Sequence, residues 1–147
     1  TKGATLDSGW ERPRPASAGG AWAENFQFIK IDGEWRMIAT ARSGELVRGG
    51  TYTGDHEPFI YRLSGDGSEF FHWRRWVDKR RLEIPEEDWN RVMHANSAQL
   101  CDFREHDGYF YLFYAGANDE VSFQKRGHGK IGMARSQDLI HWHLPGE

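Results

Sequence analysis

The sequence contains a single cysteine, Cys101, and this scarcity excludes two common frameworks. One thiol cannot form an intramolecular disulfide, so the chain is not a disulfide-stabilised scaffold. It also provides no cysteine cluster for a structural zinc site. We expect no metal site and no nucleotide or redox cofactor; a structural cation is the one exception that stays open.

Excess positive charge and long apolar runs are also missing. Nineteen Lys and Arg against 22 Asp and Glu give a net charge of −3, which does not favour nucleic acid. The basic run "RRWVDKRR" at 74–81 therefore indicates a solvated outer strand. No apolar stretch could span a bilayer, and no signal-peptide core is visible. We expect a soluble chain without a membrane partner; cytoplasmic location and secretion after removal of an upstream segment both stay open.

Aromatic residues, by contrast, are abundant: they make up 14% of the sequence, which also contains 17 glycines. Aromatic side chains favour half-buried strands and can stack on sugar rings. Glycines are typical of tight turns. The 147 residues suffice for one domain with a real core, and the composition favours an all-β fold.

Two segments of the chain are alike. "IDGEWRMIATA" at 31–41 and "HDGYFYLFYAG" at 106–116 align with Gly33 on Gly108, an offset of 75. Each has an Asp-Gly pair between hydrophobic runs, the strongest short-range signal of a β-hairpin. We therefore expect a strand, a turn and a strand in each copy.

Both copies continue in the same order. "HEPFIYRLSGDGSEFFHW" at 56–73 and "HGKIGMARSQDLIHW" at 128–142 share an initial His, a Ser-x-Asp turn and a final His-Trp pair, at an offset of 72. The predicted strands are 23–31, 34–41, 58–64, 70–76, 97–106, 109–116, 130–136 and 140–144. A repeated four-stranded antiparallel unit is typical of β-propeller blades, and two halves of a sandwich are the alternative.

This pattern divides the chain into four segments. Residues 1–20, with Pro13 and Pro15, are expected to form an entering loop. Residues 21–76 and 97–147 are the predicted first and second four-stranded blades. The polar connection 77–96 between them is expected to hold a short helix after Pro85.

The two units resemble the five-bladed β-propeller glycoside hydrolases, families 43 and 32 and their relatives. The likeness rests on "AWAENFQFIKIDGEWRMIATA", "SAQLCDFREHDGYFYLFYAGAND" and "GKIGMARSQDLIHW", and covers roughly residues 20–144. It implies part of a five-bladed propeller with a sugar site at one end of a central channel. It also implies a catalytic base Asp, for which this chain has no counterpart, so the site would be incomplete in this chain alone.

Within that resemblance, Glu24 in "AENF" matches the general acid, although the family pattern is Glu-Gly-Pro or Glu-Cys-Pro. Strand alternation would place Trp22 and Phe26 on the same face as Glu24, where they would partly desolvate an acid. Asn25 and Trp22 are assigned to the substrate. The 75-residue offset makes Gln99 the equivalent of Glu24, with Ser97 on the same strand face.

His56 and His128 precede the third strand of each copy. In the family, a channel-facing His often stands in such a loop, and a structural role is the alternative. The predicted function is therefore glycosidic-bond hydrolysis by general acid–base chemistry on a carbohydrate. The alternative is a non-catalytic carbohydrate-binding or assembly module. Missing blades would come from a homo-oligomer or from another segment.

Overall fold

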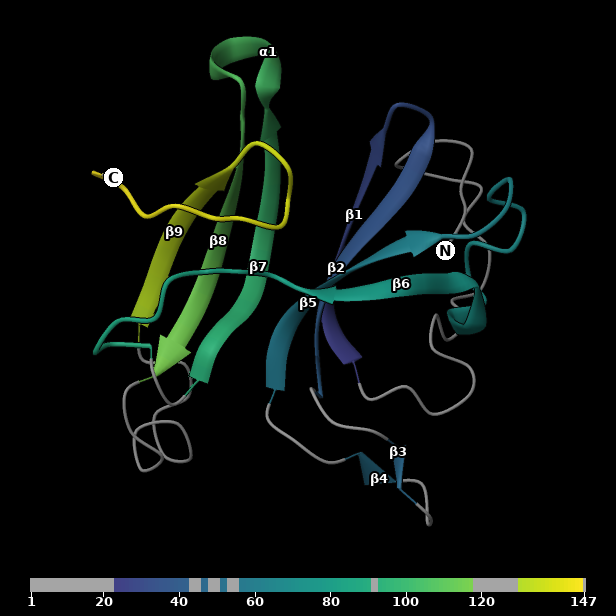
Figure 1. Cartoon of the computed structure of the whole chain (residues 1–147), viewed down its shortest axis with the longest axis horizontal. Helices are drawn as coiled ribbons and strands as arrows, with labels where there is room; N and C mark the ends of the chain where they lie inside the picture. Colours follow the sequence, from purple (N-terminus) through teal and green to yellow (C-terminus); the bar gives the residue numbers. More distant parts are fainter. Residues whose placement is uncertain are drawn as a thin grey trace, which may run out of the picture.

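The computed structural model describes residues 23–42, 46–47, 51–52, 56–90, 93–117 and 130–146. These form two antiparallel sheets, shown in Figure 1, so the prediction of a mostly β chain is confirmed. The first sheet has the order β1-β2-β5-β6 and the second the order β7-β8-β9; neither closes on itself in the described segments. The bounds are β1 Ala23–Ile31, β2 Glu34–Arg42, β5 His56–Leu63, β6 Trp76–Arg81, β7 Met93–Phe103, β8 Tyr109–Ala117 and β9 Lys130–Ser136, with β3 Leu46–Val47 and β4 Thr51–Tyr52 in a separate ladder.

The first hairpin has the predicted two-residue turn. Asp32 and Gly33 connect β1 to β2 with φ angles of 49° and 85°, both in the left-handed region. Two successive positive φ angles define the type I′ turn, whose twist matches that of the flanking strands. Asp and Gly tolerate this conformation, which explains why the pair occurs here.

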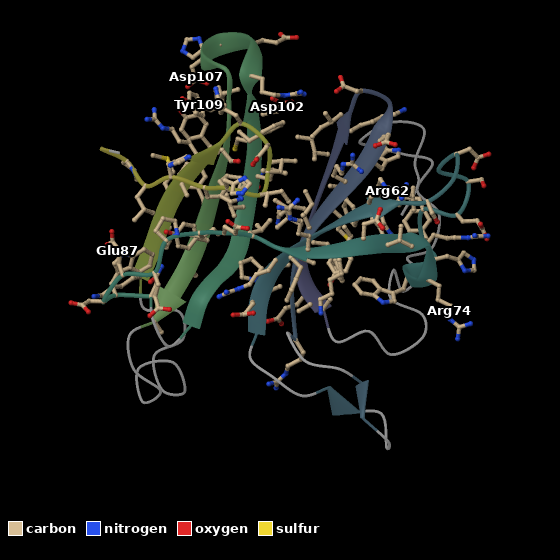
Figure 2. The ribbon with its side chains drawn as sticks, viewed as in Figure 1. Arg62, Arg74, Glu87, Asp102, Asp107 and Tyr109 are labelled. Carbon is tan, nitrogen blue, oxygen red and sulfur yellow. The ribbon has the colours of Figure 1, made fainter. Side chains whose placement is uncertain are left out.

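The second hairpin differs, although its sequence reads alike. β7 ends at Phe103, three residues earlier than predicted, and Phe103 pairs with Tyr109. Between them, α1 (Arg104–Asp107) forms a single helical turn that ends on Gly108 in the left-handed conformation, at φ 87°. Asp102 binds Arg104 through two oxygens, and Asp107 accepts a hydrogen bond from the Tyr111 hydroxyl at 2.6 Å. Figure 2 shows Asp102 and Asp107 on either side of this turn.

The fourth strand of each predicted unit is displaced. In the first sheet it is β6 at 76–81, not 70–76, because residues 64–72 form turns and η1 (Trp73–Arg75) is a 3₁₀ turn. In the second unit the predicted Ser-x-Asp turn is present: Ser136 Oγ accepts from Leu139 N, and Asp138 accepts from His141 N. The segment after it forms isolated bridges instead of a strand.

One stretch of chain joins the two sheets. After β6, residues 82–84 leave the first sheet and cross β7 and β8 of the second in the view of Figure 1, with Leu82 and Ile84 in the cluster shared by the two sheets. Glu83 donates its N–H to Ile140 O at 2.7 Å and accepts from Trp142 N at 3.0 Å. His143 in turn bonds Arg135 of β9, so the edge of the second sheet is covered. Such cover protects an edge from pairing with other chains.

The described residues 85–90 do not contain the helix predicted after Pro85. Residues 88–90 make a turn in which Asn90 N bonds Glu87 O, and Asn90 Oδ1 accepts from Glu87 N at 2.7 Å. This reciprocal pair satisfies the local backbone in a single turn, so no helix is needed. In the described segments, no helix is long and apolar enough to cross a membrane.

The two sheets pack against each other through a shared apolar cluster. β7 contacts β1, β2 and β5 of the first sheet. Ile38, with no exposed surface, lies in one cluster with Leu112 and Tyr114, also fully buried. Burial of each such side chain contributes about 1.5–3 kcal/mol, against about 0–1 kcal/mol for a surface ion pair. Apolar contact therefore holds the sheets together.

A second cluster covers the opposite face of the first sheet. Met37, Ala39 and Phe59 are its buried members in the middle of the sheet. The turn segment 64–75 supplies the half-buried Phe70 and Trp73 that pack on them. The first sheet is thus apolar on both faces, which explains why apolar residues follow one another in β2 ("MIA") and β5 ("PFIY").

Candidate functional site

Glu24 lies at a β-bulge near the start of β1. Glu24 pairs with Thr40 and Gln27 with Ile38, so two residues, Asn25 and Phe26, oppose one on β2. Asn25 has a φ of 57°, in the left-handed region that Asn tolerates better than most residues. Bulges of this kind are frequent next to active sites, where they redirect a side chain.

The bulge overturns one expectation about the surroundings of Glu24. Phe26 packs with Met37 on one face of the first sheet, stacked beside Phe28 at 6.2 Å. Glu24 pairs with Thr40, which belongs to the opposite face, and its side chain is exposed. The extra residue breaks strand alternation, so the prediction that Phe26 shares a face with Glu24 is wrong. Trp22 lies outside the described residues.

The same bulge recurs in the second sheet. Asn96 pairs with Ala115, Ser97 with Tyr114 and Gln99 with Phe113, so β7 has one extra residue between Ser97 and Gln99. The pair Gln99–Phe113 corresponds to Gln27–Ile38 in the first sheet, where the extra residue has the same place. Because Ala115 is the equivalent of Thr40, the position equivalent to Glu24 is Asn96. Sequence reasoning missed Asn96 because it applied the 75-residue offset of the hairpins to the first strand as well. The α1 turn is three residues longer than the first turn, so the offset between β1 and β7 is 72.

Gln99 and Ser97 are therefore not placed as predicted. Gln99 corresponds to Gln27, is exposed, and donates from Nε2 to Leu100 O at 3.0 Å. The register positions of Ser97 and Gln99 oppose successive residues of β8, so they do not share a strand face. Asn25 remains next to Glu24 on the bulge.

His56 begins β5 opposite Arg42, at the same end of the first sheet as Glu24. β5 starts two residues earlier than predicted, so His56 is the first residue of the third strand and does not precede it. His128 lies outside the described residues. No group of three or more His, Cys, Asp or Glu among the described side chains could hold a metal ion.

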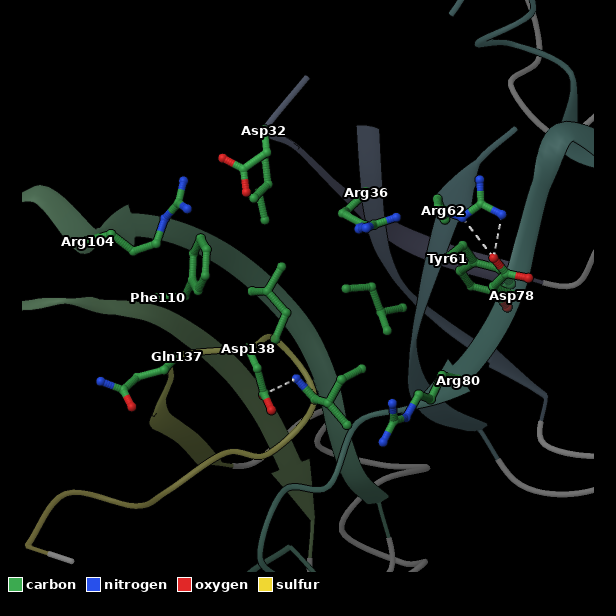
Figure 3. A pocket seen from close by; sticks show the side chains of 14 residues that line it. Asp32, Arg36, Tyr61, Arg62, Asp78, Arg80, Arg104, Phe110, Gln137 and Asp138 are labelled. Atoms are coloured by element: carbon green, nitrogen blue, oxygen red, sulfur yellow. Dashed lines mark hydrogen bonds and ion pairs between the residues drawn. The ribbon is translucent and has the colours of Figure 1, made fainter. Parts of the chain in front are cut away.

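A groove of about 460 Å³ lies at the other end of the sheets, shown in Figure 3. Residues of both sheets line it, and its wall combines apolar side chains with arginines and aspartates. Sequence reasoning assigned Asp78 and Arg80 to a solvated strand, and Asp32 and Asp138 to turns, but did not predict that they line a common groove. Its lining includes Asp32, Arg36, Arg62, Asp78, Arg80, Arg104, Phe110, Gln137, Asp138 and Leu139.

The groove arginines are held by ion pairs. Arg62 binds Asp78 at 2.6 Å, and Arg36 binds Glu34 at 2.7 Å. The Arg104 guanidinium lies 4.6 Å from the centre of the Phe110 ring while Asp102 binds it. Because each of these cations has its own carboxylate, the groove offers fixed hydrogen-bond donors and acceptors without a strong field of one sign.

A polar cluster stands beside the groove where residues 82–84 meet the second sheet. His141 Nδ1 lies 2.6 Å from Asp138 Oδ2, and His141 Nε2 lies 3.5 Å from Glu83 Oε2. The hydrogen bond and charge of Asp138, with a smaller contribution from Glu83, raise the pKa of His141. Partial burial acts to raise the pKa of Asp138, but hydrogen bonds from His141, Ile140 and Ser136 outweigh it and lower that pKa.

No protein-family model, curated protein or solved structure matches this chain. The residues themselves therefore carry the functional argument.

Proposed function

We propose that the chain forms two consecutive blade-like units of a β-propeller that acts on carbohydrate as a glycoside hydrolase, with Glu24 as the general acid. The observation that carries the proposal is the bulge at the start of the first strand of both sheets. It occurs at Glu24–Gln27 and again at Ser97–Gln99, in strands that lie next to each other. Repeated units whose first strands adjoin are compatible with blades around a common channel.

The position of Glu24 suits an acid that must reach a ligand. It is exposed at the strand end shared with His56, and the left-handed Asn25 beside it fixes the local chain direction. Backbone strain of this kind costs about 1–3 kcal/mol and concentrates at functional sites. In this proposal Glu24 protonates the leaving glycosidic oxygen, and Asn25 and Asn96 contribute to carbohydrate binding.

Hydrolysis also needs a second carboxylate, at about 5–5.5 Å from the acid in retaining enzymes or about 6.5–9.5 Å in inverting ones. Thr40 and Pro58, the residues next to Glu24 in its sheet row, are not acidic. Glu57 pairs with Ala41 on the opposite face and binds Arg81 at 2.7 Å. The second carboxylate must therefore come from outside the described first sheet.

This absence favours a second candidate, a non-catalytic carbohydrate-binding or assembly module with the same channel-end site. The two functions differ in one measurable respect. A binding module binds oligosaccharides without releasing reducing sugar, whereas the hydrolase binds them and releases reducing sugar.

Substitution Glu24→Gln tests the proposal, because glutamine keeps the size and hydrogen bonding of the side chain but cannot donate the proton. We expect turnover of a panel of aryl glycosides and oligosaccharides to fall about 10²–10⁴-fold, with oligosaccharide affinity and unfolding midpoint unchanged. Glu105→Gln, on the exposed α1 turn, is the matched control and should keep full activity. Full turnover in Glu24→Gln would refute the assignment. Binding without turnover in the parent chain, weakened by Asn96→Ala, would instead support the binding module.

A further inference from the structure

The contact between the two sheets shows which two faces of the repeated unit pack against each other. From the first sheet, Ile29, Ile31, Ile38 and Ile60 face the second sheet and join the shared cluster. From the second sheet, β7 contacts the first sheet, and Leu100, Leu112 and Tyr114 belong to the same cluster. The junction therefore brings together two unlike faces of one repeated unit.

Strand pairing identifies the equivalent of each face in the other copy. Residues with equivalent pairing partners lie 72 positions apart between β1 and β7, 75 positions apart between β2 and β8, and 73 positions apart between β5 and β9. Ile29, Ile31, Ile38 and Ile60 then correspond to Cys101, Phe103, Phe113 and Met133. These four lie together on the outer face of the second sheet, which we name the Phe113 face; Tyr111, Ile131 and Arg135 lie beside them.

The opposite half of the junction is repeated on the first sheet. Leu100 and Leu112 correspond to Phe28 and Met37, on the side of the first sheet away from the second. Segment 64–75 already buries Met37 on this side, as residues 139–142 help to bury Leu112 in the second sheet, so Phe28 is the exposed member of the pair. We name this side the Phe28 face; the half-buried Phe26, Trp35 and Phe70 lie around Phe28 and Met37. One molecule thus carries both halves of a repeat-type junction, at opposite ends.

Exposure of apolar side chains agrees with this assignment. The described large hydrophobic residues that remain exposed are Phe103 at 49%, Phe113 at 38%, Ile131 at 79% and Phe28 at 40%. The first three lie on the Phe113 face and the last on the Phe28 face. Exposed apolar side chains gathered on particular faces mark interaction sites, whereas scattered ones do not.

We propose that this chain associates head to tail with a second copy of itself, the Phe113 face of one copy packing on the Phe28 face of the next. The contact reproduces the junction that already joins the two sheets within one chain. It is heterologous, because the faces differ, so it leads to rings or open chains and not to a two-fold dimer. It rests on the sheet repeat and is independent of any catalytic role of Glu24.

Complementation between two variants tests the direction of the contact. Phe113→Lys blocks one face and Phe28→Lys the other. Glu86→Gln, exposed in the 84–90 segment, changes the net charge by the same +1 and is the control. In sedimentation velocity we expect the parent and the control to form larger species as concentration rises, and each face variant to stay monomeric. An equimolar mixture of the two face variants should form a dimer and nothing larger, because a single intact junction remains.

Two outcomes would overturn the proposal: a parent chain that stays monomeric up to submillimolar concentration, or Phe28→Lys dimers formed without the other variant. The second outcome would show a two-fold contact between Phe113 faces. Because Phe28→Lys could disturb the aromatic cluster, Cys101 provides a test that leaves the core unchanged. A bulky maleimide on this lone thiol should abolish association without lowering the unfolding temperature, and a labelled protein that associates like the parent also contradicts the contact.

Discussion

Replacement of Gly132 by alanine would place a methyl group where β9 passes the stacked rings of Trp89 and Tyr114. The rings lie 5.6 Å apart between centroids at an interplanar angle of 19°. A Cβ on Gly132 would lie 2.4 and 2.6 Å from two carbons of the Trp89 ring and 2.9 Å from Tyr114 Cζ. Normal carbon–carbon contact is about 3.5–4.0 Å, so the rings must move by about 1 Å.

The size of the effect follows from three contributions. Overpacking of this kind costs about 1–3 kcal/mol. Disruption of the Trp89–Tyr114 stack costs a further 0.5–1.5 kcal/mol or so. Alanine is about 0.5–1 kcal/mol better than glycine within a strand, which offsets part of the loss. We expect Gly132→Ala to lower the free energy of unfolding by about 1–3 kcal/mol.

Urea unfolding of parent and variant measures this loss as a lower midpoint at an unchanged slope. The matched test is the same substitution in a Trp89→Ala background, where most of the obstructing atoms are gone. There the penalty should largely disappear, which gives a coupling energy of at least about 1 kcal/mol between the two positions. An equal penalty in both backgrounds would refute the steric argument.

Two further predictions concern the second sheet. Tyr114→Phe should leave stability unchanged or raise it by up to about 1 kcal/mol in urea unfolding, because no described residue forms a hydrogen bond with the buried hydroxyl. Burial raises the pKa of Tyr114 to about 12, and the nearby Asn90 amide already forms hydrogen bonds with Pro85 and Glu87. A large loss of stability in Tyr114→Phe would contradict the absence of a described partner for the hydroxyl. For the Asp138–His141 pair, a pKa lowered from 3.8 gives stability that is lost as pH falls below about 4. A His141 pKa raised from 6.5 gives stability that is present in acid and lost as pH rises through the raised value. Urea midpoints from pH 3 to 9 should therefore form a plateau that falls on both sides, and His141→Gln should remove the alkaline fall; an alkaline limb unchanged in that variant would exclude His141 as its cause.

The hairpin repeat was predictable because strand alternation and turn chemistry are both local. β2 and β8 lie 75 residues apart at both ends, as the sequence alignment predicts. The register of β7 was not predictable in the same way. Asp107-Gly108 reads like Asp32-Gly33, but residues 104–107 coil into α1 and lengthen the turn by three residues, a choice that depends on the contacts of Asp102 and Phe110 with Arg104.

The candidate site shows the same limit. Glu24 could be singled out from sequence, but its facing could not, because a bulge is decided by pairing between strands and leaves no clear local signal. Asn96 was hidden by the longer turn, and the groove arginines come from separate elements that only the packed sheets bring together. Chemistry that depends on distant segments meeting was therefore the part that sequence reasoning missed.

The bridge between Glu83 and His141 has a consequence for the order in which the protein can fold during synthesis. Residues 82–84 leave the ribosome long before residues 140–143, yet their backbone partners are Ile140 and Trp142. Until those residues emerge, the buried Leu82 and Ile84 also lack Trp142 and Leu144 of their cluster. Closure of this long loop carries an entropic cost that is recovered only when residues 140–143 dock. The final few residues of the described chain therefore complete the fold.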